Sequence, residues 1–328
     1  MARSCGERAY TCSEITLNKY FVWISENPSE GGPFGDSAML PAMAGKPTIA
    51  IVGAGNLGTA LAVSLRRAGY GIEAIIARSR GKSLTKARVL ATQVGARAQV
   101  GGQGIEAGVM WFCVPDAAIA RAAESIALRP QAKGMVALHS SGALSSRELD
   151  PLRATGVAVA SAHPLMTFVA GAHPSLTGVP FAVEGDAAAL RVARQMVREL
   201  GGDSFVLPAT RKAAYHEWAT LTSPLLLAFL VTLEEAARAA GLTRQEGRRK
   251  SLPIIRQTLE NYSRLGPARS FSGPLVRGDA ATVAKHLDVL KKHPGAREVY
   301  VALARAALRG LPVKNREVMA KLLSAVSP

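Results

Sequence analysis

The pattern of apolar and polar positions divides the chain near residue 208. Before this point, short apolar runs rich in β-branched residues alternate with stretches in which apolar residues recur at helical spacing. This alternation predicts an α/β fold built on a doubly wound, mainly parallel sheet. The strands are expected at residues 48–52, 72–77, 96–100, 109–114, 135–139, 157–162, 180–183 and 204–207. The clearest helices between them are expected at residues 116–128, 145–154 and 186–200.

After Pro208 the strand pattern stops, and apolar residues recur at helical spacing only. Helices are expected at residues 209–240, 243–264, 279–292, 295–309 and 313–325. Asp279 is a suitable N-cap for the third of these helices. The sequence therefore predicts an α/β domain over residues 46–208 and an all-helical domain over residues 209–328.

The first predicted strand runs into the sequence GAGNLG, which is followed by a helical pattern. G-x-G-x-x-G between a strand and a helix is the fingerprint of the Rossmann dinucleotide-binding fold. There Gly53 permits the tight turn, Gly55 lets the backbone approach a pyrophosphate, and Gly58 allows helix and strand to pack closely. The helix N-terminus, with Asn56 and Leu57, offers N–H groups to the phosphates. The alternative is a strand-to-helix turn that binds no ligand.

The end of the second predicted strand selects the cofactor. An NAD-binding protein usually has Asp or Glu there to bind the ribose 2′-hydroxyl. Here the strand continues into Arg78, Ser79 and Arg80, whereas Glu73 stands at its start. Two guanidinium groups and a hydroxyl suit a 2′-phosphate, because Arg binds phosphate oxygens in a fixed fork. The sequence therefore predicts NADP(H) rather than NAD(H), and the alternative is that both arginines are solvated loop residues.

Ligands of open α/β sheets bind at the carboxyl ends of the strands. At these ends Val114 and Pro115 are expected against a ribose, and Ser140 near the nicotinamide. Ser141 and His163 are candidates for contact with the substrate. The alternatives are that the two serines cap a helix and that His163 is a hydrogen-bonded turn residue.

Lys212, Tyr215 and His216 stand at positions i, i+3 and i+4 of the first helix after residue 208, so they share one face. A reductase of a carbonyl or imine needs a proton donor, and Lys or His can serve. Lys212 and His216 are therefore candidate catalytic residues. Arg277, in the loop before the helix that Asp279 caps, is a candidate for binding an anionic substrate. The alternatives are a solvated helix start and a loop that serves only the turn.

The chain has 328 residues, of which 48% are hydrophobic, and a formal net charge of +16. The charge suits an anionic ligand such as NADP with a carboxylate substrate, although nucleic-acid binding or a bias toward Arg would also account for it. The basic residues are scattered, and no zinc-binding spacing or RNA-binding aromatic motif accompanies them. No nucleic-acid partner and no metal are expected.

Residues 1–45 lack the apolar segment of a secretory signal, so they are expected to be a disordered tail or an extension upstream of the natural start. Three cysteines, Cys5, Cys12 and Cys113, make no disulfide framework and favour a cytoplasmic protein. The longest apolar run, residues 221–233, is broken by polar residues and by Pro224, so no membrane-spanning helix is expected.

Several further motifs occur along the chain in a fixed order. They are GAGNLG, VPD, HSSGAL, AHPLMTF, FAVEGD, K-x-x-Y-H and SGPLVRGD, followed by Thr282-Val283 and His286-Leu287. As an ordered set over residues 46–310 they resemble a bacterial family of Rossmann-like proteins with a helical C-terminal domain of unknown function. That family is related to pyrroline-5-carboxylate reductase, deazaflavin-dependent NADP reductase and 6-phosphogluconate dehydrogenase-like proteins.

The resemblance implies NADP binding and a homodimer built through the helical domain. In the wider β-hydroxyacid dehydrogenase group a catalytic Lys precedes an Asn by four residues, which matches Lys212 to that Lys and places His216 where the Asn stands. Pro224 occupies a position where relatives usually have Asn, and it is placed to kink the helix and alter the pocket. Some relatives look like alternative ketopantoate reductases, which implies a 2-oxo acid as substrate.

Together these observations predict an NADPH-dependent oxidoreductase that reduces a small anionic carbonyl or imine, such as ketopantoate or a cyclic imine. A non-catalytic NADP-binding sensor or partner protein explains the glycine motif equally well. A third hypothesis is hydride exchange between NADP and a deazaflavin or flavin.

Overall fold

The structure is a computed structural model that describes residues 45–128, 134–172 and 174–325. The chain divides into two compact units after Tyr215. This division lies later than the change near residue 208 in the sequence pattern, because the first turn of the following helix packs with the α/β unit. The predicted tail at residues 1–45 lies, apart from its last residue, outside the described residues.

The α/β unit contains an eight-stranded sheet in the order β3-β2-β1-β4-β5-β6-β7-β8. All neighbouring strands are parallel except β6 and β7, which are antiparallel, so the predicted doubly wound and mainly parallel sheet is confirmed. The strands are β1 (Ile49–Val52), β2 (Ile72–Ala77), β3 (Arg97–Val100), β4 (Val109–Phe112), β5 (Val136–His139), β6 (Ala158–Pro164), β7 (Pro180–Gly185) and β8 (Asp203–Val206).

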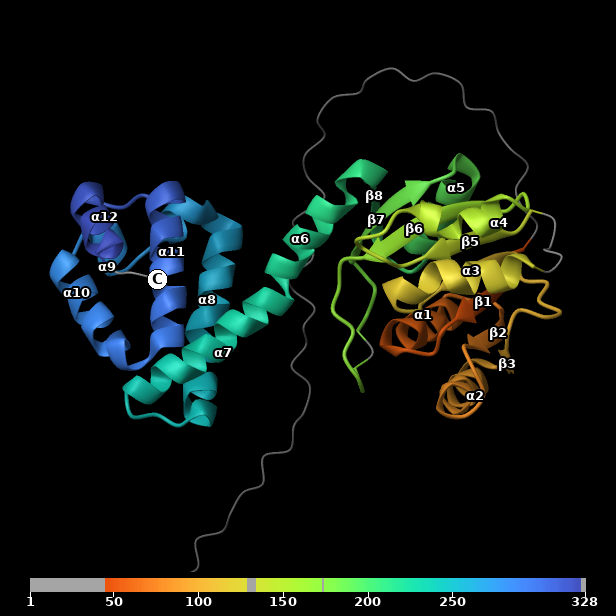
Figure 1. Ribbon diagram of the computed structural model, residues 1–328, viewed down its shortest axis with the longest axis horizontal. Coiled ribbons are helices and arrows are strands. Elements are labelled where there is room, and N and C mark those ends of the chain that lie inside the picture. Colours follow the sequence, from red (N-terminus) through yellow and green to blue (C-terminus); the bar gives the residue numbers. More distant parts are fainter. Residues whose placement is uncertain (1–44, 129–133, 173, 326–328) are drawn as a thin grey trace, which may run out of the picture. The chain divides into compact units, whose positions relative to one another are not determined.

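Helices cover both faces of this sheet (Figure 1). They are α1 (Asn56–Arg67), α2 (Lys82–Val94), α3 (Ile119–Ala127), α4 (Asp150–Arg153) and α5 (Ala187–Glu199), with short 3₁₀ helices η1 (Asp116–Ala118), η2 (Ser146–Leu149) and η3 (Ala209–Arg211). Successive side chains of a strand point to opposite faces of the sheet, so each of the two faces has its own hydrophobic core. Ile49 and Ile51 pack with α1, α2 and α5, whereas Ala50 and Val52 pack with α3 and α4.

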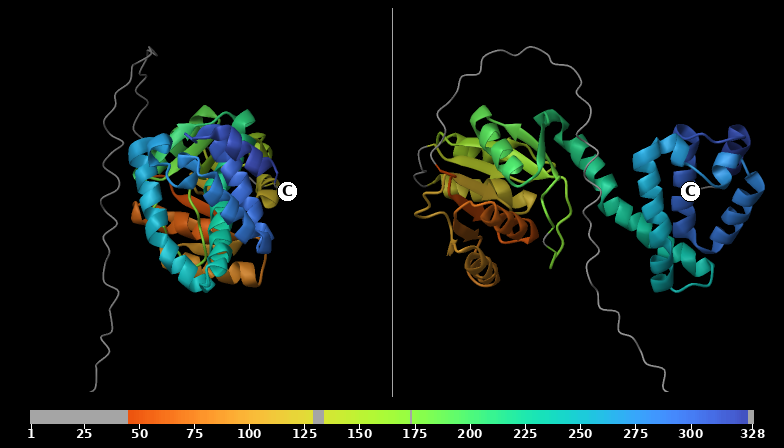
Figure 2. Two further views of the ribbon diagram at one scale, coloured as in Figure 1. Left: turned by 90° about the vertical axis from the view of Figure 1, so that its left-hand side faces the viewer. Right: turned by 180° about the vertical axis from the view of Figure 1, so that it is seen from behind.

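The helical unit has its own buried cluster, formed by α10, α11 and α12 around Val283, Val301 and Met319. The helices of this part of the chain are α6 (Lys212–Thr222), α7 (Pro224–Ala239), α8 (Arg244–Ser270), α9 (Pro274–Arg277), α10 (Ala280–Val289), α11 (Pro294–Gly310) and α12 (Arg316–Ser324). Helix α7 packs against α8 and α11 (Figure 2). The Asp279 carboxylate accepts a 3.0 Å hydrogen bond from the Thr282 N–H, which confirms the predicted N-cap of α10.

One long helix was expected over residues 209–240, but the structure breaks it at Ser223. Pro224 begins α7 at its first turn, where proline loses no hydrogen bond, instead of kinking a helix interior. Within the described residues, Ala209–Ala239 is the one helical stretch that is long and apolar enough to cross a membrane. No such stretch was expected from the sequence, because polar residues and Pro224 divide the apolar run. In the structure α7 follows α6 after one residue, so the two helices together reach this length.

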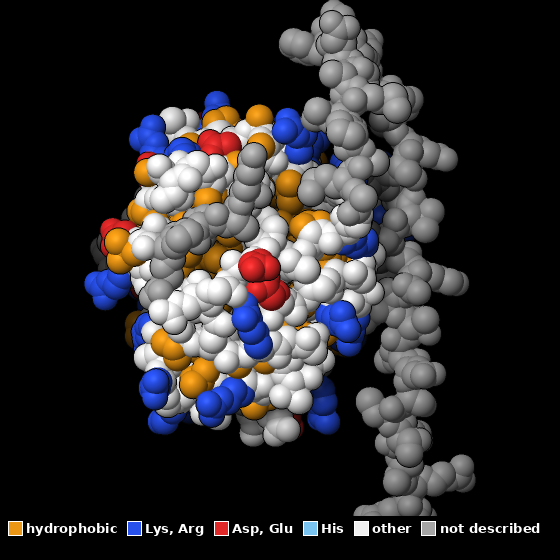
Figure 3. Space-filling model, turned by 90° about the vertical axis from the view of Figure 1, so that its right-hand side faces the viewer, with side chains coloured by type: hydrophobic (Ala, Val, Ile, Leu, Met, Phe, Trp, Pro, Cys, Tyr) orange, Lys and Arg blue, Asp and Glu red, His pale blue; other side chains and the backbone are white. Residues whose placement is uncertain are grey.

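The face of the α/β unit seen in Figure 3 carries scattered Lys and Arg side chains, with apolar and neutral surface and a few Asp and Glu side chains between them. The positive charge on this face is therefore diffuse. A diffuse charge raises the local concentration of small anions in general without marking one binding site.

Candidate functional site

The glycine turn lies at the carboxyl end of β1, beside β4. Gly53 has a φ of +106°, and a Cβ there would stand 2.6 Å from the Cys113 carbonyl oxygen. A Cβ on Gly58 would stand 2.0 Å from the Gly53 carbonyl oxygen. Both positions require glycine for the packing of the turn itself.

Gly55 is different, because a Cβ on it would meet no atom within 4 Å. Gly55 is the N-cap of α1, where no side chain caps the first N–H groups. Uncapped N–H groups beside open space are what a bound pyrophosphate needs. The Asn56 side chain donates a 3.2 Å hydrogen bond to the Phe168 carbonyl, and Leu57 packs on the core. These two residues are therefore suited to bind a phosphate through their backbone N–H groups.

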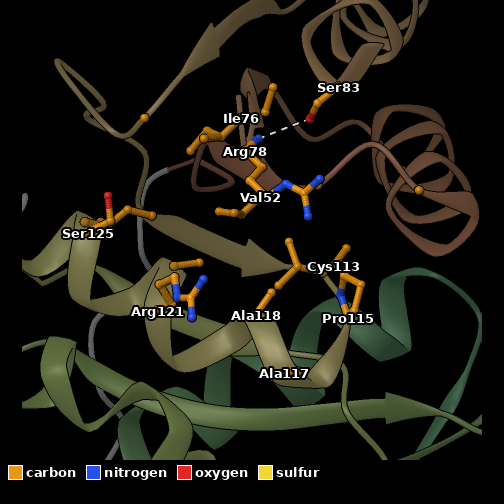
Figure 4. Close-up of a pocket in the computed structure, with 17 residues that line it drawn as sticks. Val52, Ile76, Arg78, Ser83, Cys113, Pro115, Ala117, Ala118, Arg121 and Ser125 are labelled. Carbon is orange, nitrogen blue, oxygen red and sulfur yellow. Dashed lines mark hydrogen bonds between the residues drawn. The ribbon is translucent and has the colours of Figure 1, made fainter. Parts of the chain in front are cut away.

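A cavity of about 750 Å³ opens at the turn, between the ends of β1, β2 and β4 on one side and η1 and α3 on the other (Figure 4). Its volume is in the range of small-molecule and cofactor sites. Gly53 and Gly55 line the cavity, as do Val114 and Pro115, which were expected to contact a ribose. Most of the other lining side chains are small or apolar.

The end of β2 contributes Arg78 to the cavity wall, whereas Ser79 and Arg80 are exposed and do not line it. The Arg78 N–H donates a 3.2 Å hydrogen bond to the Ser83 hydroxyl, which holds the backbone at this point (Figure 4). Glu73 forms an ion pair with Arg97 at 2.6 Å. Its carboxylate is thus engaged at the other end of the strand and is unsuited to a ribose hydroxyl.

The loop after β5 is held by buried side chains. His139 accepts a 3.1 Å hydrogen bond from the Ser141 N–H at Nδ1, which leaves the proton on Nε2 to be donated to the Ser145 carbonyl at 2.9 Å. Burial, together with the nearby positive charge of Lys212, lowers the pKa of His139 to about 4. The ring is therefore neutral near pH 7 and fixes the shape of this loop.

Both serines of this loop also have internal partners. The Ser140 hydroxyl accepts a 2.8 Å hydrogen bond from Trp111 Nε1. The Ser141 hydroxyl donates to the Asp116 carboxylate at 2.8 Å and accepts from the Leu144 N–H at 2.9 Å. These contacts hold the two hydroxyls inside the protein. They differ from the helix capping left open by the sequence, because the N-cap of the following η2 is Ser145.

The Lys212 side chain is 1% exposed and reaches the same loop from the start of α6. Its ammonium group donates to the Ser141 carbonyl at 2.8 Å and to the Ser161 hydroxyl at 2.5 Å. Burial lowers the pKa of Lys212 to about 8, while the negative charges of Glu184 and Asp116 act in the opposite direction. A protonated amine with a pKa near 8 is suited to general acid chemistry at neutral pH.

His163 and Tyr215 form a second pair beside Lys212. The Tyr215 hydroxyl and His163 Nδ1 are 2.8 Å apart, and the two rings meet edge to face. Burial raises the pKa of Tyr215 to about 12, so the phenol stays protonated near pH 7. Its O–H therefore donates a hydrogen bond to the imidazole. Tyr215 therefore sets the orientation of the His163 ring.

The other two predicted site residues belong to the helical unit. His216 is exposed on α6, and Arg277 is exposed at the end of α9. Gly278, which follows Arg277, takes a left-handed conformation, and a Cβ on it would stand 2.6 Å from the Lys314 carbonyl oxygen. The loop that carries Arg277 is thus anchored within the helical unit by close backbone packing.

Sequence reasoning missed a row of buried polar residues across the sheet. Ser161 pairs with His139 on one side and with Glu184 on the other, so the three side chains share one face. Glu184 accepts hydrogen bonds from the N–H and the hydroxyl of Ser146, which ties η2 to the row. The available signal was a polar residue inside each of three apolar strands, but only the strand register places them together.

Two family models match the chain. A Rossmann-like domain model matches residues 36–164, and the model of a domain of unknown function, DUF2520, matches residues 179–307. The chain combines a Rossmann-like domain with a DUF2520 domain. The resemblance inferred from the ordered motifs is therefore confirmed. The C-terminal match begins at Val179, immediately before β7 and ahead of the helical unit.

No curated protein matches the chain. Among solved structures, a protein from Bacteroides fragilis has 22% identity and a TM-score of 0.65, covering 79% of this chain and 97% of that one. A protein from Thermotoga maritima has 24% identity and a TM-score of 0.62, with 83% and 98% covered. A reductive aminase from Aspergillus terreus, in complex with NADPH and ethyl-5-oxohexanoate, has 17% identity and a TM-score of 0.57, with 84% and 99% covered. Pyrroline-5-carboxylate reductases and imine reductases match as well, and at these identities the likeness establishes a shared fold.

Proposed function

We propose that this protein is an NADPH-dependent oxidoreductase that reduces a small anionic carbonyl or imine compound. The observation that carries the proposal is the position of Lys212. Its buried ammonium group is hydrogen-bonded to the Ser141 carbonyl just after β5 and to the hydroxyl of Ser161, which pairs with the last residue of β5. The glycine turn lies at the carboxyl end of β1, on the same side of the sheet. Ligands of doubly wound sheets bind along this edge.

The cavity residues fit NADP(H). The open side of Gly55 and the uncapped start of α1 suit the pyrophosphate, and Arg78 suits the 2′-phosphate. Val114 and Pro115 supply apolar wall for a ribose. When bound, NADPH supplies a hydride for reduction. The fold shared with NADPH-bound and NADP⁺-bound reductases supports the same assignment.

Lys212 is the candidate proton donor. An ammonium group has three N–H donors, and in the described part of the chain two of them have acceptors. We assign the third N–H to a substrate oxygen or nitrogen, so the substrate has to reach a side chain that is 1% exposed in this structure. With a pKa of about 8, Lys212 is mostly protonated at pH 7 and can release a proton to a developing alkoxide or amine.

We further propose that the substrate carries a carboxylate, as a 2-oxo acid such as ketopantoate or a cyclic imine acid would. His163 at the end of β6, oriented by Tyr215, is suited to bind it. Arg277 of the helical unit is a separate candidate for binding an anionic group. The pyrroline-5-carboxylate reductases and imine reductases among the similar structures support the imine alternative.

The test is titration of the purified protein with NADPH and NADH, followed by addition of 2-oxo acids and cyclic imines to the NADPH complex. Preferential binding of NADPH and its oxidation by one compound class would support the proposal. Lys212→Met should bind NADPH normally and lose turnover at least about 100-fold, because it lacks the proton donor. Lys250→Met, at an exposed position on α8, is the matched control and should retain turnover.

A non-catalytic NADP-binding role is the second candidate. The observation in its favour is that Lys212 is 1% exposed and that the hydroxyls of Ser140 and Ser141 are engaged inside the protein. Two results together would favour this role over a reductase. The protein would bind NADPH without any compound oxidising it, and Lys212→Met would restore normal growth to cells that lack the natural protein.

We also propose a cytoplasmic homodimer formed through the helical unit. Leu225, Leu227 and Val231 on α7 and Ile254 and Leu259 on α8 are exposed apolar residues on two helices that pack together. Exposed large apolar side chains are typical of a protein–protein interface when they lie close together on the surface. Light scattering should give the dimer mass for the natural chain and the monomer mass for a Leu225→Glu, Leu227→Glu variant. Recovery of the protein in the membrane fraction of lysed cells would instead favour a lipid environment for α7.

A further inference from the structure

The cavity at the glycine turn has two charged lining residues, Arg78 and Arg121. No Asp or Glu of the described residues lines it. Arg78 was predicted from the sequence to contact a 2′-phosphate, but Arg121 was not, because it lies 43 residues further along the chain in a helix without a recognisable motif. The ligand group that Arg121 would contact is therefore still to be assigned.

The two arginines come from facing walls of the cavity (Figure 4). Arg78 follows β2, and its backbone N–H is held by the Ser83 hydroxyl at 3.2 Å. Arg121 is on α3, one turn before Ser125, which also lines the cavity. Ala118 and Ala122 flank it, and these short side chains leave the space into which a long side chain can extend.

Neither guanidinium has a hydrogen-bond or ion-pair partner among the described residues. The nearest acidic residue along the chain on the η1 side, Asp116, accepts a hydrogen bond from Ser141 at 2.8 Å and does not line the cavity. Two arginines on facing walls with no carboxylate between them repel each other, and a bound anion relieves that repulsion. The arrangement is therefore suited to an anionic group placed between the walls.

We propose that Arg121 and Arg78 together bind the adenosine 2′-phosphate of NADP(H), one guanidinium from each wall. The inference rests on the proposed use of this cavity for NADP(H). The pyrophosphate is accounted for by Gly55 and the start of α1, so the remaining dianionic group is the 2′-phosphate. A 2′-hydroxyl would instead require an acceptor such as Asp or Glu, which the described lining lacks. Two planar guanidinium forks match the oxygens of a phosphate monoester.

The experiment measures the binding of two nucleotide fragments, 2′,5′-ADP and 5′-ADP, to the full-length protein by calorimetry. The natural protein should prefer 2′,5′-ADP. Arg121→Gln should weaken 2′,5′-ADP binding about tenfold or more and change 5′-ADP binding less than about threefold, because it removes one charged fork from the 2′-phosphate. Arg121→Lys should restore part of the loss, since it restores the charge without the fork. Arg191→Gln, exposed on α5 away from the cavity, is the matched control for net charge.

Three outcomes would overturn the inference, and they are distinguishable. If the natural protein binds neither fragment and no NADPH, the proposed function fails with it. If the natural protein prefers 2′,5′-ADP and Arg121→Gln retains the full preference, Arg78 acts without Arg121 and only this inference fails. If Arg121→Gln weakens both fragments equally, Arg121 contacts a part that the two fragments share, the adenosine or its 5′-phosphate, and not the 2′-phosphate. Equal melting temperatures for the natural protein and the variants show that each comparison is between folded proteins.

Discussion

The Lys212 ammonium group donates a 2.8 Å hydrogen bond to the Ser141 carbonyl, joining residues 71 positions apart in the sequence. This contact brings the first turn of α6 to the carboxyl end of β5. Because Lys212 is almost fully buried there, loss of hydration lowers the pKa of its ammonium group to about 8. The fraction of Lys212 that is protonated therefore changes with pH in the range where the protein can be assayed.

The first prediction concerns the pH dependence of turnover. If Lys212 donates the proton, kcat for reduction should fall as pH rises through about 8, because the deprotonated amine cannot act as the acid. The decrease should approach about tenfold per pH unit well above the pKa. The measurement is single-turnover oxidation of bound NADPH between about pH 6 and pH 10, on either side of that pKa. A rate that stays constant across this range would exclude Lys212 as the acid.

The second prediction concerns acid stability and His139. The folded protein holds the pKa of His139 at about 4, below the 6.5 of an unperturbed imidazole, so the unfolded chain binds more protons between these values. The free energy of unfolding should therefore decrease as pH falls from 6.5 to about 4. The contribution of this one group is at most about 3 kcal/mol.

Urea denaturation of the natural protein and of His139→Gln at several pH values measures this contribution. Glutamine can accept from the Ser141 N–H and donate to the Ser145 carbonyl, but it does not titrate. The natural protein should lose stability relative to His139→Gln as pH falls through the window. A difference that is independent of pH would show that His139 is not held neutral.

The third prediction separates the roles of two glycines. Gly58→Ala should destabilise the α/β unit by about 3 kcal/mol or more, because its methyl group would overlap the Gly53 carbonyl. Gly55→Ala should change stability by about 1 kcal/mol or less, since its methyl group meets nothing within 4 Å. That methyl group would stand where the pyrophosphate is expected, so NADPH affinity should fall at least about tenfold. Thermal melts and NADPH titrations check both variants, and normal NADPH affinity in Gly55→Ala would contradict the assignment of the turn.

The sequence allowed the sheet, the glycine turn and the cavity edge to be predicted because each depends on local pattern. Val52 and Gly53, for example, are neighbours in the chain, and the strand-turn-helix context around them is contiguous. The row of His139, Ser161 and Glu184 could not be predicted in this way. It depends on the register of three strands, and a shift of one residue in any of them would place its polar side chain on the opposite face.

The contacts of individual side chains could not be predicted from local pattern either. The hydroxyls of Ser140 and Ser141 were placed at the correct strand end, but their partners, Trp111 and Asp116, come from a neighbouring strand and a 3₁₀ helix. Arg121 reaches the cavity because α3 packs in one core cluster with β4, whose following residues line the same cavity. Residue type and spacing predicted the edge of the sheet at which the candidate site lies, while the pairing of side chains there required the three-dimensional arrangement.

The last prediction concerns Tyr215, whose hydroxyl is 2.8 Å from His163 Nδ1. Tyr215→Phe removes the donor that orients the imidazole and should cost about 1 kcal/mol of stability. If His163 binds the substrate carboxylate, the same variant should raise KM several-fold and leave kcat nearly unchanged, because the ring loses its orientation while Lys212 is intact. Combined with His163→Gln, the Tyr215→Phe substitution should add little further effect, because the pair is already broken. A Tyr215→Phe variant that lowers kcat with an unchanged KM would instead place the phenol in the proton transfer itself.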